Sequence, residues 1–251
     1  LSNLIGEKNY YTQAAAGSAG GTGAVSGSLS YNYISDTTSS YIANNSMVTT
    51  ANDLNINSKN KITSAAATGS VGLGGTFGVG LASSNIIYNS TTESYLGTNS
   101  EVLNADNIYI ESVNQQDLDL YGISAGAAGS FSLSGVVNYV KSDNNTLAYV
   151  KSGSQLFASN SIDINSDNNF DLLNLAGGGA AAGTVGIGAS AAVNKVNNTT
   201  KSYLGKGVVV KKRLISEAEA VTVDNLETEI DDDKGYLLAE SIEVMVDNEK
   251  R

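Results

Sequence analysis

Five acidic side chains near the C-terminal end of the chain come closest, by type and spacing, to a metal site. They are Glu227, Glu229, Asp231, Asp232 and Asp233. Hard cations such as calcium take several carboxylate oxygens as ligands, so this group can in principle hold one. Its spacing matches no calcium-binding loop, and acidic runs usually lie in solvent. We therefore predict no metal here and treat the five carboxylates as a candidate contact site for a partner protein.

The rest of the composition leaves few routes to catalysis. The chain has no His, Cys, Pro or Trp. It therefore lacks the most common general base and metal ligand, as well as disulfides and cysteine-ligated metals. The acidic residues of the repeated region are scattered along predicted turns and strands, and no pair of them recurs beside an Arg. They are Asp53, Asp106, Glu111, Asp163 and Asp167. We expect no enzymatic activity and no cofactor.

The charge of the chain excludes two kinds of partner. The formal net charge is −11. Residues 1–210 hold 13 acidic and 8 basic residues (8 − 13 = −5), and residues 211–251 hold 12 and 6 (6 − 12 = −6). Nucleic acid and anionic membrane surfaces repel such a chain. No apolar run approaches the roughly 20 residues of a membrane-spanning helix, so the sequence predicts no membrane span.

Tyrosine recurs at a fixed spacing. The four residues Tyr41, Tyr95, Tyr149 and Tyr203 are 54 apart (95 − 41, 149 − 95 and 203 − 149). Such a period indicates tandem supersecondary units that bury apolar surface by stacking on their neighbours. A column of tyrosines suggests stacking on a carbohydrate. We favour a structural position instead, because the next residue, such as Leu96, is apolar too and one of the two must face inward. The pattern is already under way at the first residues, so we expect a fragment of a longer protein whose targeting signal lies elsewhere. Other positions with the same period are Gly21, Gly75, Gly129, Gly183, Val48, Val102, Leu156 and Val210.

Within each repeat the hydrophobic period is two, as in β-strands, and not the 3.6 of a helix. Residues 131–139, for example, alternate between large apolar and small polar side chains. We expect Phe131 and Leu133 to face the core, and Ser132 and Ser134 to face outward. A strand with this pattern has one buried and one exposed face.

A further strand is predicted at residues 107–112, with Ile108 and Ile110 inward and Tyr109 and Glu111 outward. A 54-residue repeat is too long for one coil of a β-solenoid and suits about three coils of roughly 18 residues. Stacked at ~4.8 Å, about 12 coils form a rod of about 55–60 Å. The predicted fold is therefore all-β: a parallel β-helix built from 54-residue repeats of about three coils each.

Runs of Gly and Ala begin each repeat, for example at residues 14–27 and 176–193. We expect their small residues to continue on the outward face, as at Gly78, Ser132 and Gly186. We favour the explanation that backbones approach closely there, where a larger side chain does not fit. The alternative is a flat strip of small residues that docks against another protein.

The order of these motifs resembles a known family. Over roughly residues 13–210 the chain follows the order of a "GxxGxG" run, an alternating apolar strand, "TxxYL/I", "V…A" and then "I.I.S", with individual repeats departing from single positions of these motifs. This order resembles the filamentous-haemagglutinin-like exoproteins of Gram-negative bacteria. It is most similar to the leukotoxin-type filamentous adhesins of fusobacteria, whose Asn-, Lys- and Tyr-rich composition the chain shares.

The resemblance implies a right-handed parallel β-helix in a large secreted or surface-exposed protein. It also implies export through an outer-membrane partner in two-partner secretion, and a structural or adhesive role, as adhesin or leukotoxin, toward a host-cell receptor. It implies no catalytic residues. The alternatives are a β-helical polysaccharide-active enzyme and a membrane-active toxin segment.

The repeat loses register after Val210, because Ser216 stands one period after Ile162 in place of an aliphatic residue. The pattern resumes at Ile242, whose separation from Ile162 exceeds the period by 26 (242 − 162 − 54). Loops inserted into solenoids often carry the binding function, so the candidate contact residues fall in the insertion. The predicted organisation is a repeat array at 1–213, an acidic insertion at 214–239 and a resumption of the solenoid pattern at 240–251.

Overall fold

The computed structural model describes residues 2–212, 220–222 and 242–247. All regular elements in these ranges are β-strands. The strands are β1 (Ser2–Gly20), β2 (Gly23–Ile42), β3 (Met47–Thr49), β4 (Leu54–Gly74), β5 (Phe77–Leu96), β6 (Glu101–Ala128), β7 (Phe131–Val150), β8 (Gln155–Ala182), β9 (Val185–Leu204), β10 (Val209–Lys212), β11 (Ala220–Thr222) and β12 (Ile242–Asp247).

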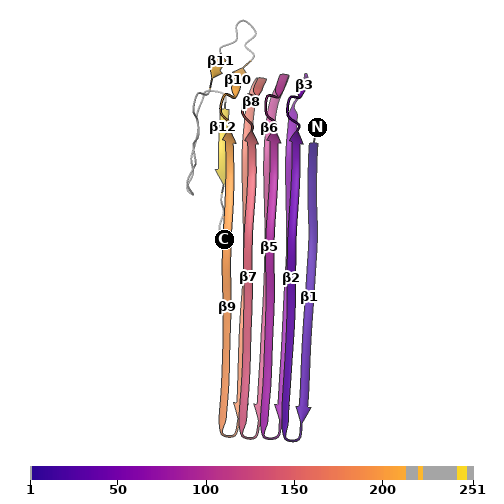
Figure 1. Ribbon diagram of the computed structural model, residues 1–251, viewed down its shortest axis with the longest axis vertical. Helices are drawn as coiled ribbons and strands as arrows, with labels where there is room; N and C mark the ends of the chain where they lie inside the picture. Colours follow the sequence, from indigo (N-terminus) through magenta and orange to yellow (C-terminus); the bar gives the residue numbers. More distant parts are fainter. Residues whose placement is uncertain (1, 213–219, 223–241, 248–251) are drawn as a thin grey trace.

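The long strands form two parallel sheets (Figure 1). One sheet has the order β1-β4-β6-β8, followed by β10 and β11, and the other has the order β2-β5-β7-β9. Each strand pairs with the strand one repeat further on: Tyr41 lies opposite Tyr95, and Tyr95 lies opposite Tyr149, so the offset equals the period of the sequence. The all-β architecture with parallel strands is compatible with the predicted solenoid.

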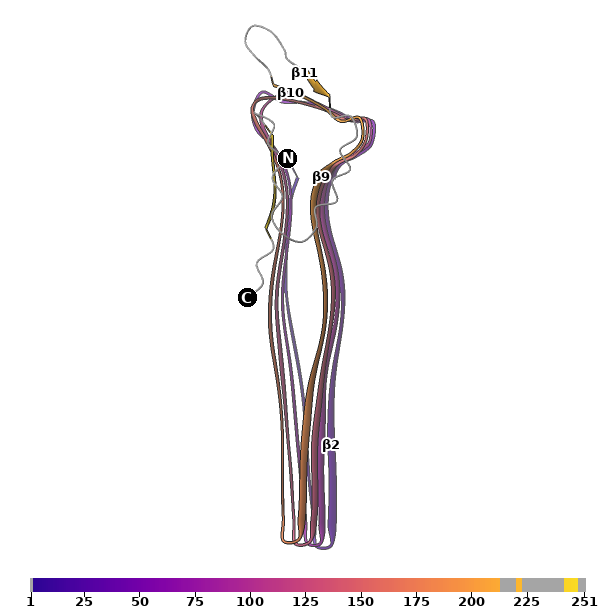
Figure 2. The same ribbon diagram turned by 90° about the vertical axis from the view of Figure 1, so that its left-hand side faces the viewer.

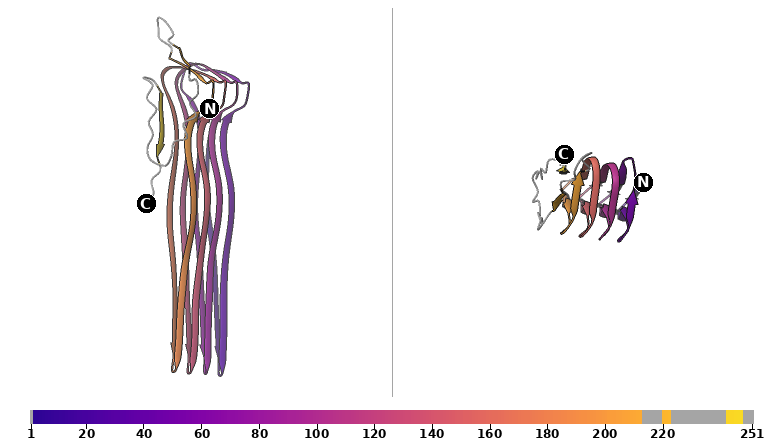
Figure 3. Two further views of the ribbon diagram at one scale, coloured as in Figure 1. Left: turned by 60° about the vertical axis from the view of Figure 1, so that its left-hand side comes forward. Right: turned by 90° about the horizontal axis from the view of Figure 1, so that it is seen from above.

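Each repeat supplies one long strand to each sheet, so the chain makes one circuit per repeat, as the pairing of Leu54 with Ile108 shows. The prediction of about three coils per repeat is therefore wrong. The predicted rod axis is wrong as well: the molecule is longest along its strands (Figures 1 and 3). A strand of 20 residues, such as β7, extends about 66 Å, whereas four stacked strands span only about 14 Å between the outermost two.

The two sheets meet at the turns that join β1 to β2, β4 to β5, β6 to β7 and β8 to β9, and we call this end the tip. The sheets diverge toward the opposite end of the strands, which we call the head (Figure 2). Backbone hydrogen bonds continue through the turns of the tip. The amide of Gly75 donates to the carbonyl of Gly20 (3.0 Å), and that of Gly129 donates to Gly75 (3.0 Å). The glycine column predicted from the sequence thus forms a ladder of turns.

An aliphatic core fills the head. Leu54, Ile56, Ile108 and Ile110 are at most 1% exposed. The prediction that Ile108 and Ile110 face inward is confirmed. Their partners in the same cluster are Leu96, Val102, Ala105, Ala148, Val150, Leu156, Ala158, Ile162, Ile164, Leu204, Val208 and Val210.

The turn that leads into this core has a residue with positive φ in every repeat. These residues are Asn45 (56°), Asn99 (52°), Gly153 (74°) and Gly207 (71°), which again recur at the sequence period. Asn and Gly adopt this conformation more readily than other residues, which explains their occurrence in this column.

In the tip the two faces of the strands are the reverse of the prediction. Phe131 is 40% exposed and Val137 52%, whereas Ser132 and Ser134 are fully buried. The alternation itself is present in the burial pattern of β7. The expectation that Phe131 and Leu133 face the core and that Gly78 and Ser132 face outward is therefore wrong.

The reason is that the two sheets approach each other too closely in the tip. A Cβ atom added at Gly78 would lie 2.4 Å from the carbonyl oxygen of Ala127, and one at Gly80 would lie 2.2 Å from that of Ala125. Only Gly, Ala and Ser fit between such surfaces, so the large side chains are turned outward. The favoured explanation of the Gly and Ala runs, close approach of backbones, agrees with these distances.

Candidate functional site

The periodic tyrosines form a continuous stack on the outer surface of the β2-β5-β7-β9 sheet at the head. Adjacent ring centroids are 5.0 Å apart, with interplanar angles of 6° for Tyr41 and Tyr95, 15° for Tyr95 and Tyr149, and 5° for Tyr149 and Tyr203. Tyrosine points outward because the residue after it, Leu96 for example, is buried in the core. Parallel in-register pairing places identical rings one strand spacing apart.

Charged side chains surround the centre of this stack. The Nζ atom of Lys151 lies 3.9 Å from the ring centroid of Tyr95 and 5.8 Å from that of Tyr149, within range of a cation–π interaction. The hydroxyl of Tyr149 donates to Oε2 of Glu93 (3.0 Å), and Ser39 Oγ donates to Oε1 of the same residue (3.1 Å). Burial, followed by the hydrogen bond to Glu93, raises the pKa of Tyr149.

This geometry bears on the two explanations of the tyrosine column. A sugar that stacks on an aromatic ring needs a free ring face. Tyr95 and Tyr149 each have a neighbouring ring on both sides, so only the outer faces of Tyr41 and Tyr203 remain. The arrangement supports a structural role, as the sequence interpretation favoured.

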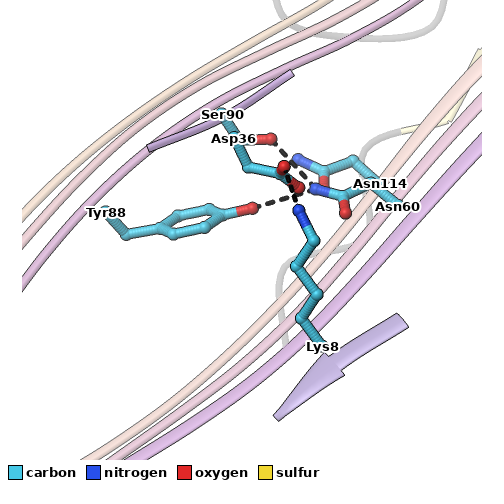
Figure 4. Close-up of polar contacts among 6 residues, drawn as sticks. All are labelled: Lys8, Asp36, Asn60, Tyr88, Ser90 and Asn114. Atoms are coloured by element: carbon cyan, nitrogen blue, oxygen red, sulfur yellow. Dashed lines mark hydrogen bonds and ion pairs between the residues drawn. The ribbon is translucent and has the colours of Figure 1, made fainter. Parts of the chain in front are cut away.

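Midway between head and tip the space between the sheets holds polar side chains (Figure 4). The amide nitrogen of Asn60 donates to the hydroxyl oxygens of Tyr88 (3.1 Å) and Ser90 (3.2 Å) and to Oδ1 of Asn114 (3.3 Å). Lys8 forms an ion pair with Asp36 beside this cluster. Tyr88 is fully buried, and burial raises its pKa to about 12.

The same pairing of identical or related side chains recurs along the stack. Ser58 pairs with Ser112 (3.2 Å), and the amide of Asn144 donates to Asn198 (2.7 Å). In each pair the partners are 54 residues apart (112 − 58 and 198 − 144). A buried amide or hydroxyl without a partner is costly, so this ladder favours one register of the repeats over its alternatives.

The five acidic residues predicted as a contact site, Glu227, Glu229, Asp231, Asp232 and Asp233, lie outside the described residues. Their role stays a prediction, as do the boundaries of the insertion at 214–239. Strand β12 pairs in parallel with β8, and Ile242 lies opposite Ile162, the residue to which the sequence pattern relates it. The backbone at 242–247 therefore occupies the position next to β8 in the stack.

The acidic residues of the repeats do not form a metal site. Within the ranges that the structure describes, no three His, Cys, Asp or Glu residues are placed to hold a cation. Asp53 instead accepts a hydrogen bond from the side-chain amide of Asn107 (2.7 Å), its neighbour in the next repeat. The carboxylates thus take part in contacts between strands.

Comparisons with protein-family models, with curated proteins and with solved structures found no match. No helix in the described part of the chain is long and apolar enough to cross a membrane.

Sequence reasoning missed two features of the structure. One is the polar ladder, because Ser and Asn in a strand were expected to face solvent; their regular period, as at Ser58 and Ser112, was the available signal. The other is the outward position of the large side chains in the tip, such as Leu81 and Ile187. The density of Gly and Ala on the alternate positions was the signal for that.

Proposed function

We propose that this chain is a structural and adhesive segment of a large secreted or surface-exposed bacterial exoprotein that contacts host cells. The observation that supports this proposal is the parallel pairing of each repeat with the next in both sheets, as between Tyr95 and Tyr149. Every further repeat adds one strand to each sheet with the same contacts, so such an array lengthens without a change of cross-section.

The resemblance to filamentous adhesins provides the biological class. On this proposal the winding is right-handed, as parallel crossovers generally are. The full-length protein is exported through an outer-membrane partner and meets a host-cell receptor. The acidic insertion is the most suitable contact site, because it interrupts a surface that otherwise repeats.

The test is binding of the purified chain to leukocytes and epithelial cells, measured by flow cytometry. One variant replaces residues 214–239 with a short Gly-Ser turn. A second, of unchanged length, converts Glu227 and Glu229 to Gln and Asp231, Asp232 and Asp233 to Asn. We expect both variants to keep the β-rich circular dichroism spectrum and to lose binding.

Binding that persists in both variants assigns adhesion to the repeats and removes the insertion from the proposal. Failure of the unaltered chain to bind any of these cells contradicts an adhesive role for this segment.

A further inference from the structure

The tip of the molecule carries no charge. Each of the four circuits contains a stretch without Asp, Glu, Lys or Arg that runs down one strand, through the turn and back along the next. The stretches are residues 9–35, 62–92, 120–140 and 172–194.

The uncharged part is as long as a lipid hydrocarbon layer is thick. The shortest stretch covers nine residues of β6, 120–128, and ten of β7, 131–140. Because the strands are in register, the other circuits are uncharged over at least the same rows. At about 3.3 Å per residue this band is about 30 Å long, which equals the usual hydrocarbon thickness of about 30 Å.

Both outer faces of this band are predominantly apolar, although Gln13, Ser83 and Asn85 are polar positions on them. On the β1-β4-β6-β8 sheet Ile123 is 67% exposed and Leu175 52%, and on the other sheet Val137 is 52% and Ile187 48% exposed. Next to the turns small residues occupy the inner face, as the close approach at Gly78 requires, and farther from the turns Val136 and Leu120 are buried there. Further exposed apolar side chains of the band are Val25, Leu29, Val71, Leu73, Phe77, Leu81, Phe131, Leu173, Val185 and Val193.

A shallow groove of about 700 Å³ crosses the outer face of the β2-β5-β7-β9 sheet. Leu29, Leu81 and Val137 line it, and Gly27 and Gly135 leave it open. Its lining is of the kind that accepts a hydrocarbon chain.

Aromatic and charged residues mark the boundary of the band on the side of the head. Tyr11 is 70% exposed and Tyr31 55%. Nearer the head, Asp117 lies opposite Asp171 on the neighbouring strand of one sheet, and Lys141 lies opposite Lys195 on the neighbouring strand of the other. Tyrosines at an interface with charged residues outside them are typical of protein surfaces that cross from lipid to water.

We propose that the uncharged tip inserts into the hydrocarbon layer of a lipid bilayer while the head stays in water. A second copy of the chain docked on one sheet would account for one apolar face only. A lipid layer accounts for both faces, for the uncharged turns and for the length of the band. This proposal does not depend on the adhesive function.

Insertion places a demand on the open edges of the sheets. In the tip, β1, β2, β8 and β9 each have one side without a strand partner among the described residues. Unpaired backbone groups are very costly in hydrocarbon. These edges therefore need a strand partner in the bilayer, which a further repeat or a second copy of the chain supplies. When the chain is tested alone, we expect oligomers after chemical cross-linking in lipid.

The test uses a matched pair of lysine substitutions on β7. Val137 lies within the band, and Asn145 lies on the same exposed face, nearer the head. The full chain, Val137→Lys and Asn145→Lys are floated with phosphatidylcholine vesicles over a range of lipid concentrations. A lysine at hydrocarbon depth lowers the partition coefficient of the chain between water and vesicles by about 30-fold or more. Val137→Lys should therefore lose vesicle binding at the lipid concentrations that float the unaltered chain. Asn145→Lys should match the unaltered chain.

Depth is measured with a tryptophan reporter, since the chain has no Trp of its own. Ile187→Trp places one in the band and Asn145→Trp one above it. Brominated acyl chains should quench the fluorescence of the first and not of the second. Circular dichroism verifies that all variants remain folded.

Three results would overturn the proposal: no flotation of the unaltered chain, equal flotation of the two lysine variants, or equal quenching of the two tryptophans. If Val137→Lys instead abolishes self-association in lipid-free solution and vesicle binding is absent, the tip is an interface between copies of the chain.

Discussion

The inverted faces of the tip make a direct prediction about two glycines in neighbouring strands. Gly78 in β5 is buried between the sheets, and an added Cβ would lie 2.4 Å from the carbonyl oxygen of Ala127 and 2.8 Å from that of Gly72. Gly135 in β7 faces outward, and an added Cβ would meet a methyl carbon of Leu81 at 3.2 Å and the carbonyl oxygen of Ala189 at 3.9 Å, an ordinary contact distance. The pattern of apolar residues in the sequence alone assigns these two glycines the opposite faces.

The perturbation is a single methyl group at each site. In Gly78→Ala the neighbours are backbone atoms of the opposite sheet, which cannot move without separating the sheets, so we expect destabilisation by about 1–3 kcal/mol. In Gly135→Ala the Leu81 side chain can rotate away. The loss of backbone freedom in the unfolded chain then stabilises the protein by up to about 1 kcal/mol.

The assay is urea unfolding of both variants and the unaltered chain, followed by far-ultraviolet circular dichroism. The expected order of midpoint concentrations is Gly78→Ala lowest and Gly135→Ala equal to or above the unaltered chain. If Gly78→Ala is tolerated and Gly135→Ala is the destabilising change, the small residues do not lie between the sheets and the reasoning fails.

Two further predictions concern the interior. Ile110 is fully buried in the head core, so Ile110→Ala should lower the free energy of unfolding by about 2–5 kcal/mol. The control, Asn145→Ala at the exposed surface, should change it by less than about 0.5 kcal/mol. Equal effects of the two substitutions would contradict the assigned core. Burial raises the pKa of Tyr88 to about 12 from 10.0, so the unfolded chain loses this proton first. Its contribution to stability is therefore intact below pH 10 and is lost progressively as the pH rises through 12, by up to about 2.7 kcal/mol. Unfolding measured at stepwise pH should show this fall in the unaltered chain and a smaller one in Tyr88→Phe, and parallel curves for the two proteins would refute it.

The tyrosine column was predicted in part. Its period indicated that Tyr41, Tyr95 and their equivalents would stack, and the buried neighbour Leu96 indicated that one of each pair faces inward. The sequence did not indicate that Glu93 binds Tyr149, because these residues are 56 apart (149 − 93). Only the stacking of one circuit on the next brings them together.

The sequence by itself determined that the chain is built of β-strands and that its positions recur every 54 residues. Alternation with a period of two specifies strands, and a strict repeat lets identical positions pair, as Tyr95 does with Tyr149. Both are local or periodic properties that need no knowledge of the third dimension.

The tertiary structure decided which face lies inside and how many circuits each repeat makes. Burial follows from the distance between the two sheets, which no single strand encodes. At the head the sheets are far enough apart for Ile110 and Leu54 to fill the space, and there the rule that apolar residues face inward holds. At the tip the sheets are so close that only small side chains such as Ser132 fit, so the larger apolar residues are left on the outer surface.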